Sequence, residues 1–260
     1  LLSLVHLHRQ KSNMKQARTI MGMPVVIEVI DDKITEEVFE KVFTYLQYVD
    51  RTFSPYKADS EVSAINAHTV LPYDYSSDMK AILAASEETK KLTDGYFDIS
   101  KDGKIDPSGI VKGWAIYNAA KILESHGFTN YCVEIAGDIE LSGLNDQRTT
   151  WRIGIRNPFK HDEIVKVITL SKGGIATSGT YEQGQHIYNP KDTTQKLDEV
   201  VSITVIGPNI FDADRFATAA FAMQRDGISF IERLKGFEAY MIDRDGIATQ
   251  TSGLGIYISE

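Results

Sequence analysis

The order of the expected secondary-structure elements is the feature that most limits how this chain can fold. After a β-branched strand pattern at residues 23–30, amphipathic patterns predict long helices at 35–54, 76–96 and 107–127. From about residue 128 the chain changes to short apolar segments separated by Gly, Asn and Pro, which is typical of β-hairpins. Helices and strands that occur in separate runs predict an α+β fold rather than a regular βαβ repeat.

The chain has 260 residues, and we expect one domain over residues 18–260 after an N-terminal tail at 1–17. The change of composition near residue 128 is the one candidate for a subdivision. The chain begins with Leu, so we take Met14 as a candidate for the natural start. At the other end we expect a closing hairpin and then an edge strand in the last apolar segment, "LGIYIS".

Composition and charge exclude several classes of function. With 42% hydrophobic and 25% charged residues, the chain can bury a core. Its formal net charge of −8, without a basic stripe, argues against a nucleic-acid partner. The single Cys132 cannot form an internal disulfide. No segment is long and apolar enough for a membrane span, and the N-terminus lacks a good signal segment, so we expect a cytoplasmic protein.

Two oxygen-bearing side chains stand four residues apart in the segment "DADRFATAAFAM", which reads as a helix. Residues i and i+4 lie on the same helix face, so Asp214 and Thr218 can direct their oxygens at one object. Carboxylate and hydroxyl oxygens suit Mg²⁺ or Ca²⁺. A purely structural role also fits, in which Asp212 is the N-cap, Asp214 favours the helix dipole and Thr218 bonds back to the backbone.

Several loops carry acids, glycines and aromatic residues that a purely structural connection does not need. The segment "KIDPSGIVKGWA" places Asp106 and Lys112 at the start of a helix, where exposed amides can bind an anion, although Asp106 or Ser108 also suits plain capping. The segments "TDGYFDIS", "EIAGDIE" and "SKGGIATSG" are of the same kind. The chain has no Walker A lysine, no GxGxxG before a helix, no HExxH and no GxSxG.

Taken together and in this order, these segments resemble the ApbE family of flavin transferases. The resemblance runs from about Thr19 to the C-terminus and rests on the following segments: "TIMGMPVVIEV", "TFSPYKADSEVSAIN", "DGYFDIS", "IDPSGIVKGWAI", "EIAGDI", "GGIATSG", "HIYNP" and "DADRFATAAFAM". It implies an ApbE-like α+β architecture, with helices on mixed or antiparallel sheets and FAD in a cleft between the two halves.

The resemblance also implies roles for individual residues. Asp214 and Thr218 match the side-chain ligands of Mg²⁺ and are the expected catalytic residues, and Gly109 matches the backbone carbonyl ligand. Met21 and Tyr56 match residues that line the flavin ring. The remaining expected contacts to FAD are Tyr96, Phe97, Asp98, Asp106, Lys112, His186 and Tyr188.

The activity that the resemblance implies is a magnesium-dependent transfer of FMN from FAD to a Thr or Ser hydroxyl of an acceptor protein, with release of AMP. The expected partners are FAD and that acceptor protein. Two alternatives stay open. The same site can hydrolyse FAD to FMN and AMP with water as acceptor, or the protein can bind FAD without turnover.

Overall fold

The structure is a computed structural model, which describes residues 14–179 and 187–258. Its α-helices are α1 (Glu36–Phe53), α2 (Glu61–Asn66), α3 (Ser77–Leu92), α4 (Ser108–Ser125), α5 (Ile210–Ala222) and α6 (Asp226–Glu232), with 3-10 turns η1 (Pro72–Asp74) and η2 (Leu254–Tyr257). Its strands are β1 (Met14–Ile20), β2 (Met23–Val29), β3 (Ser100–Lys101), β4 (Lys104–Ile105), β5 (Tyr131–Ile135), β6 (Asp138–Ser142), β7 (Trp151–Asn157), β8 (Lys160–Leu170), β9 (Lys172–Gly179), β10 (Val200–Gly207), β11 (Glu238–Asp243) and β12 (Ala248–Gln250). Across this part of the chain, each helix is too short or too polar to cross a membrane.

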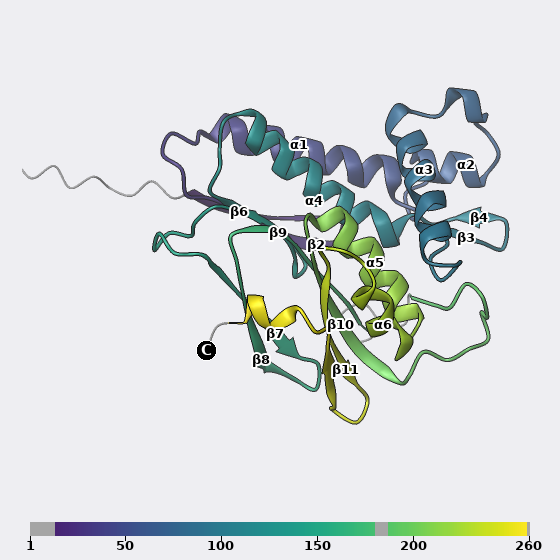
Figure 1. Cartoon of the computed structure of the whole chain (residues 1–260). Helices are drawn as coiled ribbons and strands as arrows, with labels where there is room; N and C mark the ends of the chain where they lie inside the picture. Colours follow the sequence, from purple (N-terminus) through teal and green to yellow (C-terminus); the bar gives the residue numbers. More distant parts are fainter. Residues whose placement is uncertain (1–13, 180–186, 259–260) are drawn as a thin grey trace, which may run out of the picture.

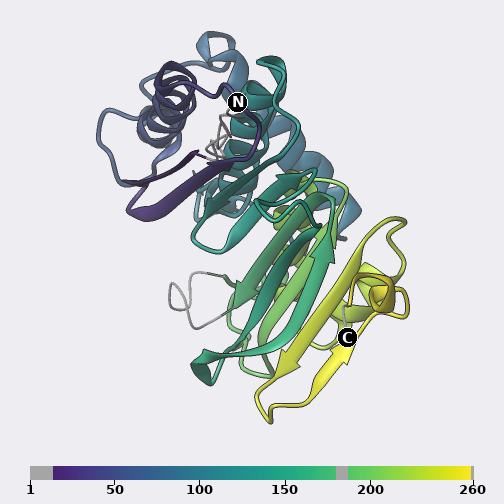
Figure 2. The same ribbon diagram turned by 90° about the vertical axis from the view of Figure 1, so that its left-hand side faces the viewer.

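One eight-stranded antiparallel sheet organises the molecule, in the order β1-β2-β5-β6-β9-β10-β11-β12. Figure 2 shows the N-terminal strands in purple at one end of this sheet and the C-terminal strands in yellow at the other. Because β2 pairs with β5, elements from before and after residue 128 share one sheet. The expected α+β class is therefore confirmed, and the composition change near 128 does not separate two sheets.

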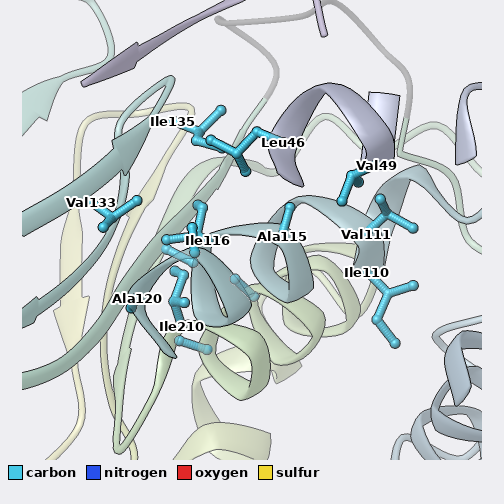
Figure 3. Packing of buried hydrophobic residues seen from close by; sticks show 14 of the residues in the cluster. Leu46, Val49, Ile110, Val111, Ala115, Ile116, Ala120, Val133, Ile135 and Ile210 are labelled. Carbon is cyan, nitrogen blue, oxygen red and sulfur yellow. The ribbon is translucent and has the colours of Figure 1, made fainter. Parts of the chain in front are cut away.

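Both faces of the sheet are covered. Helices α1, α4 and α5 lie along one face, and the β7–β8 hairpin packs on the other (Figure 1). Helix α4 lies centrally in the helical layer: Ala115 and Ile116 on α4 lie near Leu46 of α1, Val133 of β5 and Ile210 of α5 (Figure 3). This layer contains the larger core, in which the long apolar side chains of the helices and of the sheet pack together.

The structure corrects two expectations at the chain ends. Residues 14–17, expected in the tail, belong to β1, which pairs with β2 through the two-residue turn at Met21 and Gly22. Strand β1 alternates between half-buried and exposed positions at the edge of the sheet, so it lacks an apolar run. The last apolar segment, expected as an edge strand, forms the 3-10 turn η2 and a single bridge between Ile168 and Ile258.

The start of α5 also differs from the purely structural role considered above, in which Asp212 is the N-cap and Asp214 favours the helix dipole. Its N-cap is Asn209, whose side chain accepts a hydrogen bond from the backbone amide of Asp212. Asp212 lies in the first turn and pairs with Arg215 at 2.6 Å. Asp214 consequently belongs to the buried interior of the helix rather than to its capping end.

Candidate active site

The predicted site residues line one pocket of about 640 Å³ that opens between the helical layer and the ends of the strands. All eleven of them that the structure describes are in its wall: Met21, Tyr56, Tyr96, Phe97, Asp98, Asp106, Gly109, Lys112, Tyr188, Asp214 and Thr218. The twelfth, His186, lies outside the described residues. The wall is assembled from segments before and after residue 128, so only the tertiary fold brings these side chains together.

Helices α4 and α5 meet at the wall of this pocket. The contact surface of α4 consists of small residues, and that of α5 carries oxygen-bearing side chains. On α4, Gly109 and Gly113 stand four residues apart, and on α5 Asp214 and Thr218 do the same. A Cβ atom on Gly113 would lie 2.6 Å from Asp214 Cβ, and one on Gly109 would lie 3.2 Å from Thr218 Cγ2. The two glycines therefore let the backbones approach until the oxygens of α5 meet those of α4.

Asp214 and Thr218 each contact the backbone of α4 across this helix pair. Thr218 Oγ1 lies 3.4 Å from the carbonyl oxygen of Gly109, in a long hydrogen bond. The Asp214 carboxylate accepts a hydrogen bond of 2.7 Å from the backbone amide of Gly113. Asp214 and Thr218 thus take part in the contact between α4 and α5 as well as facing the pocket.

The environment of Asp214 opposes its ionisation. The residue is 4% exposed, and burial raises the pKa of its carboxyl well above the usual value. The neighbouring carboxylate of Asp138 raises this pKa further, whereas Lys112 and the amide of Gly113 lower it. A buried pair of acids with one lysine beside them has an excess of negative charge, which a cation would relieve.

These residues fit a hard divalent cation. Their donor set would be a carboxylate oxygen, a hydroxyl oxygen and a backbone carbonyl oxygen, the ligand types that Mg²⁺ and Ca²⁺ prefer. Within the described residues, no group of three or more His, Cys, Asp or Glu side chains forms a metal site. A cation bound between α4 and α5 would therefore be coordinated by Asp214, by neutral protein oxygens and by oxygens of a ligand.

A second group of predicted residues lies at another part of the pocket wall, just after α3. Phe97 is buried, and Asp98 pairs with Lys90 at 2.6 Å. The hydroxyl of Tyr188 donates to the carbonyl of Asp98 at 3.3 Å, so the chain after residue 187 rests against this segment. Lys101 lies over the Tyr188 ring at 4.4 Å and adds a cation to the pocket wall.

Met21 and Tyr56 lie on loops at the rim. Met21 has a positive φ of 56° in the β1–β2 turn, followed by Gly22 at 71°, as a tight hairpin turn requires. Tyr56 lies in the loop between α1 and α2 and is 90% exposed. Such exposure does not fit a tyrosine that packs the turn, and it leaves the ring available to a ligand.

Asp106 and Lys112 flank the start of α4. Asp106 Oδ1 accepts a hydrogen bond of 3.0 Å from the amide of Ser108. The N-cap of α4 is however Pro107, so the capping alternative, with Asp106 or Ser108 as N-cap, is wrong. The ammonium of Lys112 lies 2.7 Å from Asp138 Oδ2 and forms an ion pair with it. Asp138 is not among the residues predicted from the sequence. Its only signal is an acid directly after the turn in "EIAGDIE".

Comparisons with known proteins agree with this arrangement. The model of the ApbE family matches residues 21–103 and 100–241. The FAD:protein FMN transferase of Haemophilus influenzae is 25% identical over 96% of this chain and 93% of its own length. That of Escherichia coli K12 is 24% identical over 85% and 81%.

Solved structures show the same fold. The flavin transferase ApbE from Vibrio cholerae has a TM-score of 0.85 and is 25% identical, and the match covers 95% of this chain and 99% of the other. The ApbE protein from Thermotoga maritima also has a TM-score of 0.85, at 23% identity, over 96% and 100% of the two chains. The chain thus has the sequence pattern and the architecture of this group along nearly its whole length.

Proposed function

The chain belongs to the ApbE family, and from this premise we propose that it is an FAD:protein FMN transferase. The reaction proposed is a magnesium-dependent transfer of FMN from FAD to a Thr or Ser hydroxyl of an acceptor protein, with AMP as leaving group. The observation that carries the proposal is the pocket itself. It gathers the described residues expected to contact the flavin, the adenosine, the diphosphate and the metal, although they come from separate parts of the chain.

In the proposed binding mode, Met21 and Tyr56 contact the flavin ring. The segment Tyr96 to Asp98 contacts the adenosine, and Tyr188 closes against that segment. The diphosphate lies between these ends, near Lys112 and the start of α4. A site in a chain of net charge −8 needs such local cations to hold a dianionic ligand.

During transfer, the acceptor hydroxyl oxygen forms a bond to the phosphorus of the FMN half while the bond from that phosphorus to the AMP oxygen breaks. The hydroxyl proton is lost, and AMP leaves with the bonding electrons. Asp214, Thr218 and the Gly109 carbonyl would hold Mg²⁺, which when bound supplies Lewis-acid stabilisation of charge on the phosphoryl oxygens. The remaining task of the protein is to orient FAD and the hydroxyl, and Lys112 adds a fixed positive charge.

The test incubates the protein with FAD and Mg²⁺, with and without a peptide that contains the acceptor Thr or Ser, and measures AMP, free FMN and peptide mass. Transfer predicts AMP together with a peptide heavier by FMN. AMP with free FMN and an unchanged peptide would identify a hydrolase. Absence of AMP in every mixture would leave an FAD-binding protein without turnover.

Two substitutions test the metal assignment. Asp214→Asn replaces a charged hard ligand by a near-isosteric amide, so it should remove most of the magnesium-dependent AMP release. Thr218→Ala should weaken the magnesium dependence less, because a neutral hydroxyl is the poorer ligand. Asp212→Asn is the matched control, since it removes a carboxylate from the same helix outside the pocket wall and should leave the activity unchanged. Wild-type AMP release by Asp214→Asn, with the same magnesium dependence, would contradict the assignment.

A further inference from the structure

One buried carboxylate lies directly behind the pocket wall. Asp138 is the first residue of β6 and is only 1% exposed, and it is not itself part of the wall. It nevertheless interacts with three residues that are. Its Oδ2 lies 2.7 Å from the Lys112 ammonium, its Oδ1 accepts a hydrogen bond of 2.9 Å from the amide of Thr177, and its negative charge raises the pKa of Asp214.

The register of β6 places this acid in the protein interior. Ile139 and Leu141 point into the core beneath the β7–β8 hairpin, so Asp138 and Glu140 point toward the helical layer. Glu140 has an evident structural task there, because it accepts a hydrogen bond of 2.6 Å from the amide of Ile210 at the start of α5. Asp138 is the other buried acid on this side of the strand.

The contact with Thr177 does not by itself require a charged residue. An asparagine carbonyl could accept the same hydrogen bond without the desolvation penalty of a buried carboxylate and without repelling Asp214. Of the three neighbours, only Lys112 gains from the negative charge. An ammonium has three donors, so the contact with Asp138 orients Lys112 and still leaves its charge directed at the pocket.

We propose that Asp138 is a positioning residue, which holds the Lys112 ammonium in place for the diphosphate of the ligand. It acts through Lys112 and does not touch the reacting atoms. This inference rests on the proposed function for the identity of the ligand. It predicts that Asp138 and Lys112 affect FAD affinity jointly, and this coupling can be measured by FAD binding even if no transfer takes place.

The experiment is a double-mutant cycle with Asp138→Asn, Lys112→Met and the double variant. FAD affinity is measured by quenching of intrinsic fluorescence, and AMP release is measured in the presence of Mg²⁺. Asp138→Asn keeps the acceptor for Thr177 and removes the charge. It should weaken FAD binding by about tenfold, because the buried ion pair that holds Lys112 in place is lost. In the Lys112→Met background the same change should have an effect of less than about twofold, because the partner is already absent.

Asp243 provides a matched control. It is also a buried carboxylate, whose Oδ2 lies 3.0 Å from Arg225 and whose Oδ1 accepts hydrogen bonds from the amides of Asp245 and Ile247, and it is outside the pocket wall. Asp243→Asn therefore removes the same charge from the same kind of contact. It should change FAD affinity by less than about twofold in both backgrounds.

Equal losses from Asp138→Asn in the two backgrounds, or no loss in either, would overturn the proposal. If Asp138→Asn alone does not fold, the double variant is compared with Lys112→Met. Weaker FAD binding by the double variant than by Lys112→Met would refute the proposal. Failure of the wild type to release AMP would refute the proposed function only, since the FAD-binding cycle still measures the coupling. A wild type that does not bind FAD would refute both.

Discussion

Replacing Gly113 with alanine tests whether the site depends on the close approach of α4 and α5. In an open helix this change would stabilise the protein by about 1 kcal/mol, because alanine has the higher helix propensity. Here the new Cβ would lie 2.6 Å from Asp214 Cβ and 2.9 Å from the carbonyl oxygen of Ile210. Both neighbours belong to α5, and one of them is backbone, so a side-chain rotation cannot relieve the contact.

The size of the displacement follows from these distances. Asp214 Cβ would have to move by about 0.8 Å to reach 3.4 Å, where ordinary contact begins. Overpacking of this kind destabilises by about 1–3 kcal/mol, which exceeds the propensity gain. The melting temperature should fall by a few degrees, since about 1 kcal/mol corresponds to roughly 2–4 °C in a chain of this size. Misplacement by about 1 Å near the reacting groups can lower the rate by about 100-fold.

The assay for Gly113→Ala is magnesium-dependent AMP release together with thermal unfolding. Gly154→Ala is the control, because the three atoms nearest to its Cβ, the closest at 2.8 Å, all belong to the flexible Ile164 side chain, on the hairpin away from the pocket wall. It should keep the activity of the wild type. A Gly113→Ala protein with raised stability and wild-type activity would refute the view that the close helix contact positions Asp214.

Two further predictions concern ligand binding and stability. Tyr56→Ala should weaken flavin binding while leaving the melting temperature of the free protein nearly unchanged, because the side chain is 90% exposed; a large loss of stability would contradict a ligand-stacking role. Burial, only partly offset by the hydrogen bond from Ile210, raises the pKa of Glu140 to about 7. The pKa of Glu140 is therefore higher in the folded than in the unfolded protein, so protonation of this carboxyl stabilises the fold. The stabilisation is present below about pH 4.5 and is lost as the pH rises through 7. Relative to the wild type, Glu140→Gln should therefore gain about 3 kcal/mol in unfolding free energy between pH 4 and pH 8, and denaturant titrations that show no such change would contradict it.

Local pattern was sufficient for the long helices and for strand β2. The expected helices at 35–54 and 107–127 correspond to α1 and α4 within one or two residues. The sequence also placed Asp214 and Thr218 on one face of a helix, which follows from the spacing alone. It could not reveal β1, because that edge strand has no apolar run and is defined by its pairing with β2.

The environment of the site depended on contacts between distant segments. The pattern of β6, which alternates acids with Ile139 and Leu141, is typical of a strand with one face in water. In the folded protein helices cover that face, so Asp138 and Glu140 are buried beside α4 and α5. The sequence by itself determined which residues carry oxygen donors and which helix faces they share, because these properties depend on local spacing. Only the tertiary structure decided which charges become neighbours and how much water they lose, because electrostatic interactions depend on distances across the core.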